Sequence, residues 1–129
     1  MGSETYHEPL ELLSERTRNL HRAIISLIEE FEAVDWYQQR AEAASDSELK
    51  AVLMHHRSEE IEHAMMNLEW LIRNDEVIAE NAKTYLFSTG PITEVEATAK
   101  ASEVAGGSKS GGSGPSSASL GIGSLKAGG

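Results

Sequence analysis

The stretch that decides the fold is Glu59-Glu60-Ile61-Glu62-His63, which lies inside an otherwise amphipathic segment. Glu60 and His63 are three residues apart, so on a helix both side chains project from the same side. That side is the apolar stripe of the segment, which also carries Leu49, Leu53 and Trp70. Because an unpaired carboxylate is costly to bury, the pattern predicts a helix whose apolar face holds a polar site.

Two long helices are predicted around this stretch. The first runs from about Pro9 to Ala44, without internal Pro or Gly, and its apolar residues recur at intervals of three and four. Pro9 suits a first helical turn, where its missing N–H is no loss. The order Ser-x-x-Glu in Ser45-Asp46-Ser47-Glu48 is that of a capping box, so we expect the second helix to begin near residue 45 and to end near Asn74.

The rest of the chain divides into shorter parts. A third helix is expected from Asp75 to about Phe87, ended by Gly90-Pro91, with a last helical turn or two over residues 92–103. From Gly106 to Ser119, eleven of fourteen residues are Gly or Ser, a composition typical of a flexible linker. We therefore expect a helical domain over 1–98, a Gly/Ser linker over 99–118 and a separate terminal peptide over 119–129.

Composition excludes several classes of function. The 129 residues include no cysteine, which excludes a disulfide scaffold, a thiolate zinc site and a cysteine nucleophile. The net charge of −10 argues against nucleic acid and favours a cationic partner. No apolar run approaches the roughly 20 residues of a membrane span, and the start of the chain lacks the order of a signal peptide. We expect a cytoplasmic protein that does not enter a membrane.

The predicted helices do not complete a bundle. Two helices of roughly 30 residues are each about 45 Å long and leave one face of the hairpin uncovered. Four-helix bundles solve this problem by packing two hairpins, and a second copy of the chain can supply the other one. The predicted fold is all-α: a long antiparallel two-helix hairpin plus a short C-terminal helix, which forms a homodimer.

A further inward-facing carboxylate, in the first predicted helix, indicates a metal site. Glu30 interrupts the apolar run of the first helix as Glu60 and His63 interrupt that of the second. Bundles that hold two irons take a Glu from each of two helices and a Glu-x-x-His from each of the other two. Two copies of this chain supply that full set, and carboxylate and imidazole ligands suit iron.

Other interpretations of these three residues stay open. Glu-x-x-His arises by chance in Glu-rich helices, so a solvated acidic face is one alternative. The chain would then be a non-enzymatic helical interaction module. A di-manganese or peroxide-consuming bundle would keep the same ligands and change the substrate.

Neighbouring polar residues are weaker candidates. Glu29 and Glu32 share a face with Trp36 and form either an acidic mouth that collects cations or a solvated face. Tyr37 lies two turns beyond Glu30, where it is an electron donor, a neighbour of the ligands or an interface tyrosine. The pair His55-His56 is ambiguous, although His56 falls one turn before Glu60 on the same stripe.

Three blocks together resemble the encapsulated ferritins. They are Glu29-Glu30-Phe31-Glu32-Ala33-Val34-Asp35-Trp36-Tyr37, Glu59-Glu60-Ile61-Glu62-His63-Ala64-Met65, and Thr84-Tyr85-Leu86-Phe87 with Gly90-Pro91-Ile92. The resemblance covers about residues 7–95. It implies a half-ferritin subunit that assembles as a decameric ring of dimers, and a ferroxidase that oxidises Fe(II) to Fe(III) with dioxygen at a di-iron site across the dimer interface.

The resemblance also implies roles for single residues. Glu30, Glu60 and His63 match the family's iron ligands. Glu29 and Glu32 match a second, weaker metal site, for a cation such as Ca²⁺, on the approach path to the iron. Three further positions match family residues near these sites: Trp36 beside the second site, His55 at an outer metal site and Tyr37 beside the di-iron centre.

The end of the chain resembles a targeting signal. Ser119-Leu120-Gly121-Ile122-Gly123-Ser124-Leu125-Lys126 is similar to the peptide that loads cargo proteins into encapsulin shells. On a flexible tether, Leu120, Ile122 and Leu125 would be apolar anchors for the shell protein. The implied location is the inside of an encapsulin nanocompartment, where oxidised iron is stored. A terminus derived from a cloning vector is the alternative.

Overall fold

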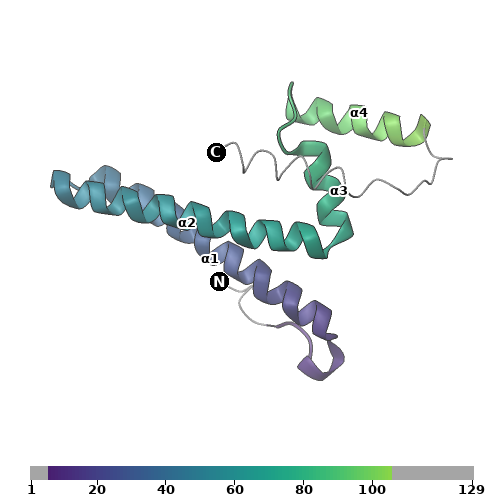
Figure 1. Cartoon of the computed structure of the whole chain (residues 1–129), viewed down its shortest axis with the longest axis horizontal. Helices are drawn as coiled ribbons and strands as arrows, with labels where there is room; N and C mark the ends of the chain where they lie inside the picture. Colours follow the sequence, from purple (N-terminus) through teal and green to yellow (C-terminus); the bar gives the residue numbers. More distant parts are fainter. Residues whose placement is uncertain (1–5, 106–129) are drawn as a thin grey trace. The chain divides into compact units, whose positions relative to one another are not determined.

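The computed structural model describes residues 6–105, and this part of the chain is entirely helical. Its elements are the 3-10 helix η2 (Leu10–Leu12) and the α-helices α1 (Glu15–Ala43), α2 (Ser47–Asn74), α3 (Glu76–Tyr85) and α4 (Ile92–Ala105) (Figure 1). The all-α prediction is confirmed. None of the helices in this range has the length and apolar character needed to cross a membrane.

Helices α1 and α2 form the predicted long hairpin, in which they lie side by side and antiparallel (Figure 1). They have 29 and 28 residues, so α2 is close to its predicted length and α1 is shorter than predicted because it begins later. The second helix starts one residue later than the capping box predicts, because Asp46 is the N-cap and its side chain accepts a 2.7 Å hydrogen bond from the Leu49 amide. A carboxylate accepts this bond and also interacts favourably with the positive end of the helix dipole.

The first helix begins later than predicted. Ser14, not Pro9, precedes it, and the Ser14 hydroxyl accepts a 3.1 Å hydrogen bond from the Thr17 amide. Pro9 instead precedes the short η2, and Leu13 has an extended backbone that separates η2 from α1. The prediction was wrong here because Pro is equally acceptable before a 3-10 turn, whereas Ser14 offers the side-chain acceptor that a helix start favours.

The hairpin has almost no core of its own. Among the described residues, the buried apolar side chains are only those of Ala41, Ala64 and Leu71. Many large apolar side chains of the hairpin are exposed instead: Ile24, Phe31, Trp36, Leu49, Val52, Met54, Met65, Met66 and Trp70. Such an amount of exposed apolar surface is unusual for a chain that stays monomeric, so the hairpin has the character of one half of a bundle.

The second compact unit begins at Val77 and contains most of α3 and all of α4. The third helix ends at Tyr85, two residues before the predicted end, because Phe87 adopts the left-handed region with φ of 63°. Gly90 follows with φ of 87°, a conformation that glycine adopts without strain.

The fourth helix is longer than the expected turn or two. It has 14 residues and is rich in alanine, the best helix former. An ion pair of 3.4 Å between Lys100 and Glu96 also supports it. Residues 99–105, which were expected to belong to the linker, are helical. The boundaries of the linker and the terminal peptide stay a prediction.

Candidate metal centre

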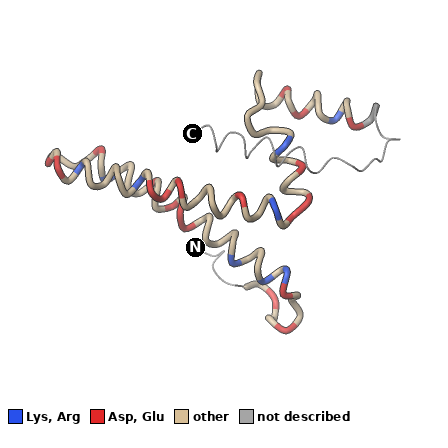
Figure 2. The backbone as a smooth tube through the Cα atoms, viewed as in Figure 1, with Lys and Arg blue, Asp and Glu red and all other residues tan. Residues whose placement is uncertain are grey.

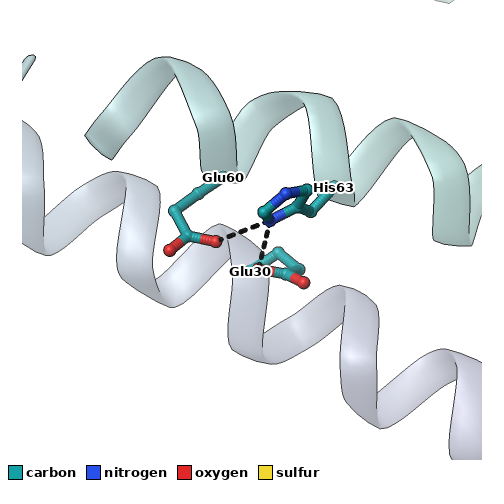
Figure 3. A group of neighbouring side chains, drawn as sticks. All are labelled: Glu30, Glu60 and His63. Atoms are coloured by element: carbon teal, nitrogen blue, oxygen red, sulfur yellow. Dashed lines mark hydrogen bonds and ion pairs between the residues drawn. The ribbon is translucent and has the colours of Figure 1, made fainter. Parts of the chain in front are cut away.

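The hairpin brings together the three residues predicted as metal ligands. Glu30 of α1 lies opposite Glu60 and His63 of α2 (Figure 3). One ligand atom from each of the three lies within 4.8 Å of the other two. His63 Nδ1 is 3.3 Å from Glu60 Oε1 and 3.9 Å from Glu30 Oε1. We call these three residues the ligand group.

The local helix geometry and the hairpin each contribute one part of this arrangement. Glu60 and His63 are adjacent because residues three apart on a helix share a side. Glu30 precedes Glu60 by 30 residues in the sequence. It meets Glu60 and His63 because α1 and α2 pack against each other in an antiparallel register. The ligand group is therefore held by two packed helices, not by a loop.

The two carboxylates of the ligand group shift each other's pKa in opposite directions. The pKa of Glu30 is raised above its ordinary value, first by its hydrogen bond with Glu60 and then by burial and the nearby negative charges. The pKa of Glu60 is lowered, first by the same hydrogen bond with Glu30 and, among smaller causes, by His63 and His56. Of the two carboxylates, Glu30 is therefore the one that is easier to protonate, and a bound cation would relieve the repulsion between them.

The ligand group is open on one side. About a quarter of each carboxylate side chain is exposed, 25% for Glu30 and 24% for Glu60, and 45% of the His63 side chain is exposed. Ligands of a complete buried site would be covered and hydrogen-bonded on all sides. The ligand group on this chain therefore remains accessible to a further ligand or to a neighbouring surface.

The donor set fits a divalent cation of intermediate hardness. Carboxylate oxygen and imidazole nitrogen bind iron, manganese and zinc, whereas the chain has no thiolate with which to favour softer metals. Figure 2 shows Asp and Glu gathered near the middle of the α1–α2 hairpin. In the sequence, Glu29 and Glu59 adjoin the two ligand carboxylates, and the basic Arg57 lies one turn before Glu60. The field of the acidic residues attracts cations to the site.

The residues predicted for a second metal site do not join the ligand group. Glu29 is exposed, Glu32 is partly buried, and 46% of Trp36 is exposed. Within residues 6–105, no other cluster of three or more metal-binding side chains meets the same distance limit. Glu29 still acts on the ligand group, because its charge contributes to the raised pKa of Glu30. A cation site at Glu29 and Glu32 stays a prediction.

Tyr37 and His55, both predicted near the metal sites, make contacts with different residues. Tyr37 stacks on His56, with ring centroids 5.2 Å apart and planes at 27°, and Arg40 lies 5.4 Å from the Tyr37 centroid. His55 instead forms an ion pair with Glu59 when its imidazole is protonated, at 3.6 Å. The stacking role of His56 was not predicted, although its place one turn before Glu60 was the signal that could have indicated it.

The predicted anchors of the terminal peptide are Leu120, Ile122 and Leu125, and they lie outside the described residues. Their role stays a prediction.

Comparisons with known proteins agree with one another. A family model described as EncFtn-like matches residues 5–89, which include the whole ligand group. A curated protein of Rhodospirillum rubrum, named "Encapsulated ferritin-like protein", is 57% identical over 126 residues, which are 97% of this chain and 90% of that protein. A "Ferritin-like protein" of Thermotoga maritima is 46% identical over 107 residues, 83% of this chain and 90% of the other.

A solved structure is also similar. The crystal structure of protein ne0167 from Nitrosomonas europaea has a TM-score of 0.66 and 56% sequence identity, and the match covers 67% of this chain and 96% of that chain. At this identity, the match supports the same helical architecture for both chains.

Proposed function

This chain belongs to the EncFtn-like family, and from that premise we propose that it is a ferroxidase, which oxidises Fe(II) to Fe(III) with dioxygen. The observation that carries the proposal is the ligand group, in which two carboxylates and an imidazole converge within 4.8 Å on the open face of the hairpin. Iron is the substrate of this reaction, and the di-iron site is where two Fe(II) ions bind.

A second copy of the chain completes the site in this proposal. One ligand group supplies half of the residues that di-iron bundles use, and a twofold axis supplies the other half. The result is four carboxylates and two imidazoles around two irons. The partial exposure of all three side chains and the exposed apolar residues of the hairpin support a partner on this face.

Each residue of the ligand group has a part in binding the substrate. The carboxylates of Glu30 and Glu60 neutralise the positive charge of Fe(II), and the bound cation relieves the repulsion between them that helps to raise the pKa of Glu30. His63 adds a neutral nitrogen ligand and restricts the position of Glu60 through their 3.3 Å contact. Bound iron supplies one electron per ion to dioxygen, and carboxylates stabilise the Fe(III) product because they are hard anionic ligands.

The surrounding acidic residues would deliver the substrate. We assign Glu29 and Glu32 to a weaker cation site, for Fe(II) on its approach or for a cation such as Ca²⁺, with Trp36 beside it and His55 at the outer end of the path. Tyr37 is assigned to the di-iron centre as a neighbouring catalytic residue. The acidic residues around the middle of the hairpin support this assignment (Figure 2).

The name of the Rhodospirillum rubrum protein suggests where this chain acts. We propose that dimers assemble into a decameric ring and that the ring is cargo of an encapsulin nanocompartment in the cytoplasm, which stores the oxidised iron. Residues 119–129 would bind the shell protein through Leu120, Ile122 and Leu125. Deletion of 119–129 is expected to abolish copurification with a coexpressed encapsulin and to leave iron oxidation intact, and retention in the shell would contradict the assignment.

The ferroxidase proposal is tested by iron binding and oxidation in one series. Anaerobic titration should saturate at about two Fe(II) per pair of chains, and oxygen should then produce the absorbance of Fe(III). Glu30→Ala and His63→Ala should lose both signals, whereas Glu42→Ala, an exposed glutamate near the end of α1, should keep them. Iron binding without oxidation, or turnover with peroxide in place of dioxygen, would contradict the proposal.

A further inference from the structure

We propose that His56 is a positioning residue, which holds the Tyr37 side chain beside the ligand group and thereby controls the rate of iron oxidation. This inference deepens the ferroxidase function proposed above and rests on it. Its starting point is the only stacked pair of aromatic rings that joins α1 to α2 within the described residues, the pair Tyr37 and His56.

The Tyr37 ring is restricted by both helices. The His56 ring of α2 stacks on it at 5.2 Å with an angle of 27° between the planes. The Arg40 guanidinium of α1 lies 5.4 Å from the centroid of the same ring, within the range of a cation–π contact. Two such contacts limit rotation of the tyrosine side chain, so the direction of its hydroxyl depends on them.

The stacked pair lies in line with the ligand group. Tyr37 follows Glu30 by seven residues in α1, and His56 precedes His63 by seven residues in α2. Because the helices are antiparallel, these equal steps lead in the same direction along the hairpin. Seven residues are nearly two full turns, about 10.5 Å, so the stack and the ligand group lie on the same side of the hairpin.

The Tyr37 side chain leans from its backbone toward the ligand group. Side chains on a helix tilt toward its N-terminus, so the tyrosine leans from its own Cα toward the turns that lead back to Glu30. On α2, Glu60 is one turn beyond His56 and thus lies between the stack and His63. The orientation of the Tyr37 ring therefore sets how close its hydroxyl comes to the ligand carboxylates, to which a phenol can donate a hydrogen bond.

His56 contributes little to the fold itself. The residue is exposed, whereas Tyr37 is partly buried. Besides Tyr37, the ring of His56 has an edge contact with the ring of His55, at 6.2 Å. Within one chain, removal of this ring should leave the hairpin folded and should remove the stack on Tyr37.

The experiment combines a measurement of Tyr37 with a measurement of the reaction. In protein with labelled tyrosine, the Tyr37 ring signals are assigned as those that Tyr37→Phe removes. His56→Ala should shift these signals, since the ring current of a stacked neighbour is lost, and His56→Phe should retain an aromatic shift. In the rate of Fe(III) formation, His56→Ala should lower kcat by about three- to tenfold without a change of KM for Fe(II), and His56→Phe should restore the rate.

A double mutant separates positioning from any other role. If His56 acts through Tyr37, then His56→Ala should have no further effect on kcat in the Tyr37→Phe background. The matched control is His21→Ala, which removes a histidine that also contacts a tyrosine, Tyr6, at 4.1 Å, but outside the ligand group. This control should leave kcat unchanged.

Three outcomes would overturn the inference. His56→Ala could oxidise iron at the wild-type rate, or it could lower kcat as much in the Tyr37→Phe background as in the wild type. The third is that His56→Phe fails to restore the rate. Failure of the proposed function looks different, because the wild-type protein would then bind Fe(II) without oxidising it. The shift of the Tyr37 signals would in that case still decide whether His56 holds the ring.

Discussion

Replacement of Glu30 by Gln is expected to stabilise the metal-free protein and to remove its stabilisation by metal. The ligand atoms of Glu30 and Glu60 lie within 4.8 Å of each other, and two full negative charges at that distance repel by about 3.5 kcal/mol at an effective dielectric constant of 20. The partial exposure of both side chains, 25% and 24%, lets solvent screen this repulsion and reduces its cost to about 1 kcal/mol. Gln removes the charge and can still donate a hydrogen bond to Glu60.

Bound metal should stabilise the wild type but not the Glu30→Gln variant. A ligand at 100 times its dissociation constant stabilises a protein by about 2.7 kcal/mol. For a domain of this size, 1 kcal/mol shifts Tm by about 4–8 °C. Wild type should therefore gain about 10–20 °C with saturating Co(II), whereas Glu30→Gln should gain almost nothing and should start about 4–8 °C higher.

The assay is thermal unfolding followed by circular dichroism, with and without Co(II), at one fixed protein concentration because a dimer's Tm depends on concentration. Co(II) is chosen because it binds the same ligand types and does not react with oxygen as Fe(II) does. Glu42→Gln is the matched control, an exposed glutamate on the same helix, and should behave as wild type. A wild-type Co(II) shift in Glu30→Gln would refute its role as a ligand, and a lower metal-free Tm would refute the repulsion.

Three further predictions concern the hairpin. Asp46→Ala should lower the free energy of unfolding by about 1 kcal/mol in urea denaturation, because it removes the N-cap of α2. Ser45→Ala is the control and should have little effect. A larger loss of stability in Ser45→Ala than in Asp46→Ala would mean that the cap is at residue 45. Phe31→Asp should shift the protein toward the monomer in sedimentation experiments, since it places a charge on an exposed apolar side chain, and an unchanged oligomer would show that this side chain lies outside the interface. His63→Ala should weaken Co(II) binding by at least about 100-fold in calorimetry, and an unchanged affinity would remove His63 from the ligand group.

Sequence patterns determined most of the helical framework. The presence of two long helices and the end of each follow from their uninterrupted periodicity, and the turn between them follows from the polar residues at 45–48. The exact starts of the helices did not follow, since Ser45 and Asp46 are both good caps, and a choice between them depends on the backbone of the turn. The length of α4 was underestimated, because alanine gives a weak amphipathic pattern even where it strongly favours a helix.

Part of the metal site follows from local helix geometry, and part depends on how the two helices pack. The sequence by itself determined that Glu60 and His63 are neighbours, because three residues of α-helix fix that geometry wherever the helix lies. Only the tertiary structure decided that Glu30 joins them at 3.9 Å from His63, and that Tyr37 stacks on His56. Both contacts depend on the register in which α1 packs against α2. That register is set by the combined packing of two long helices, and no single residue or spacing along the chain encodes it.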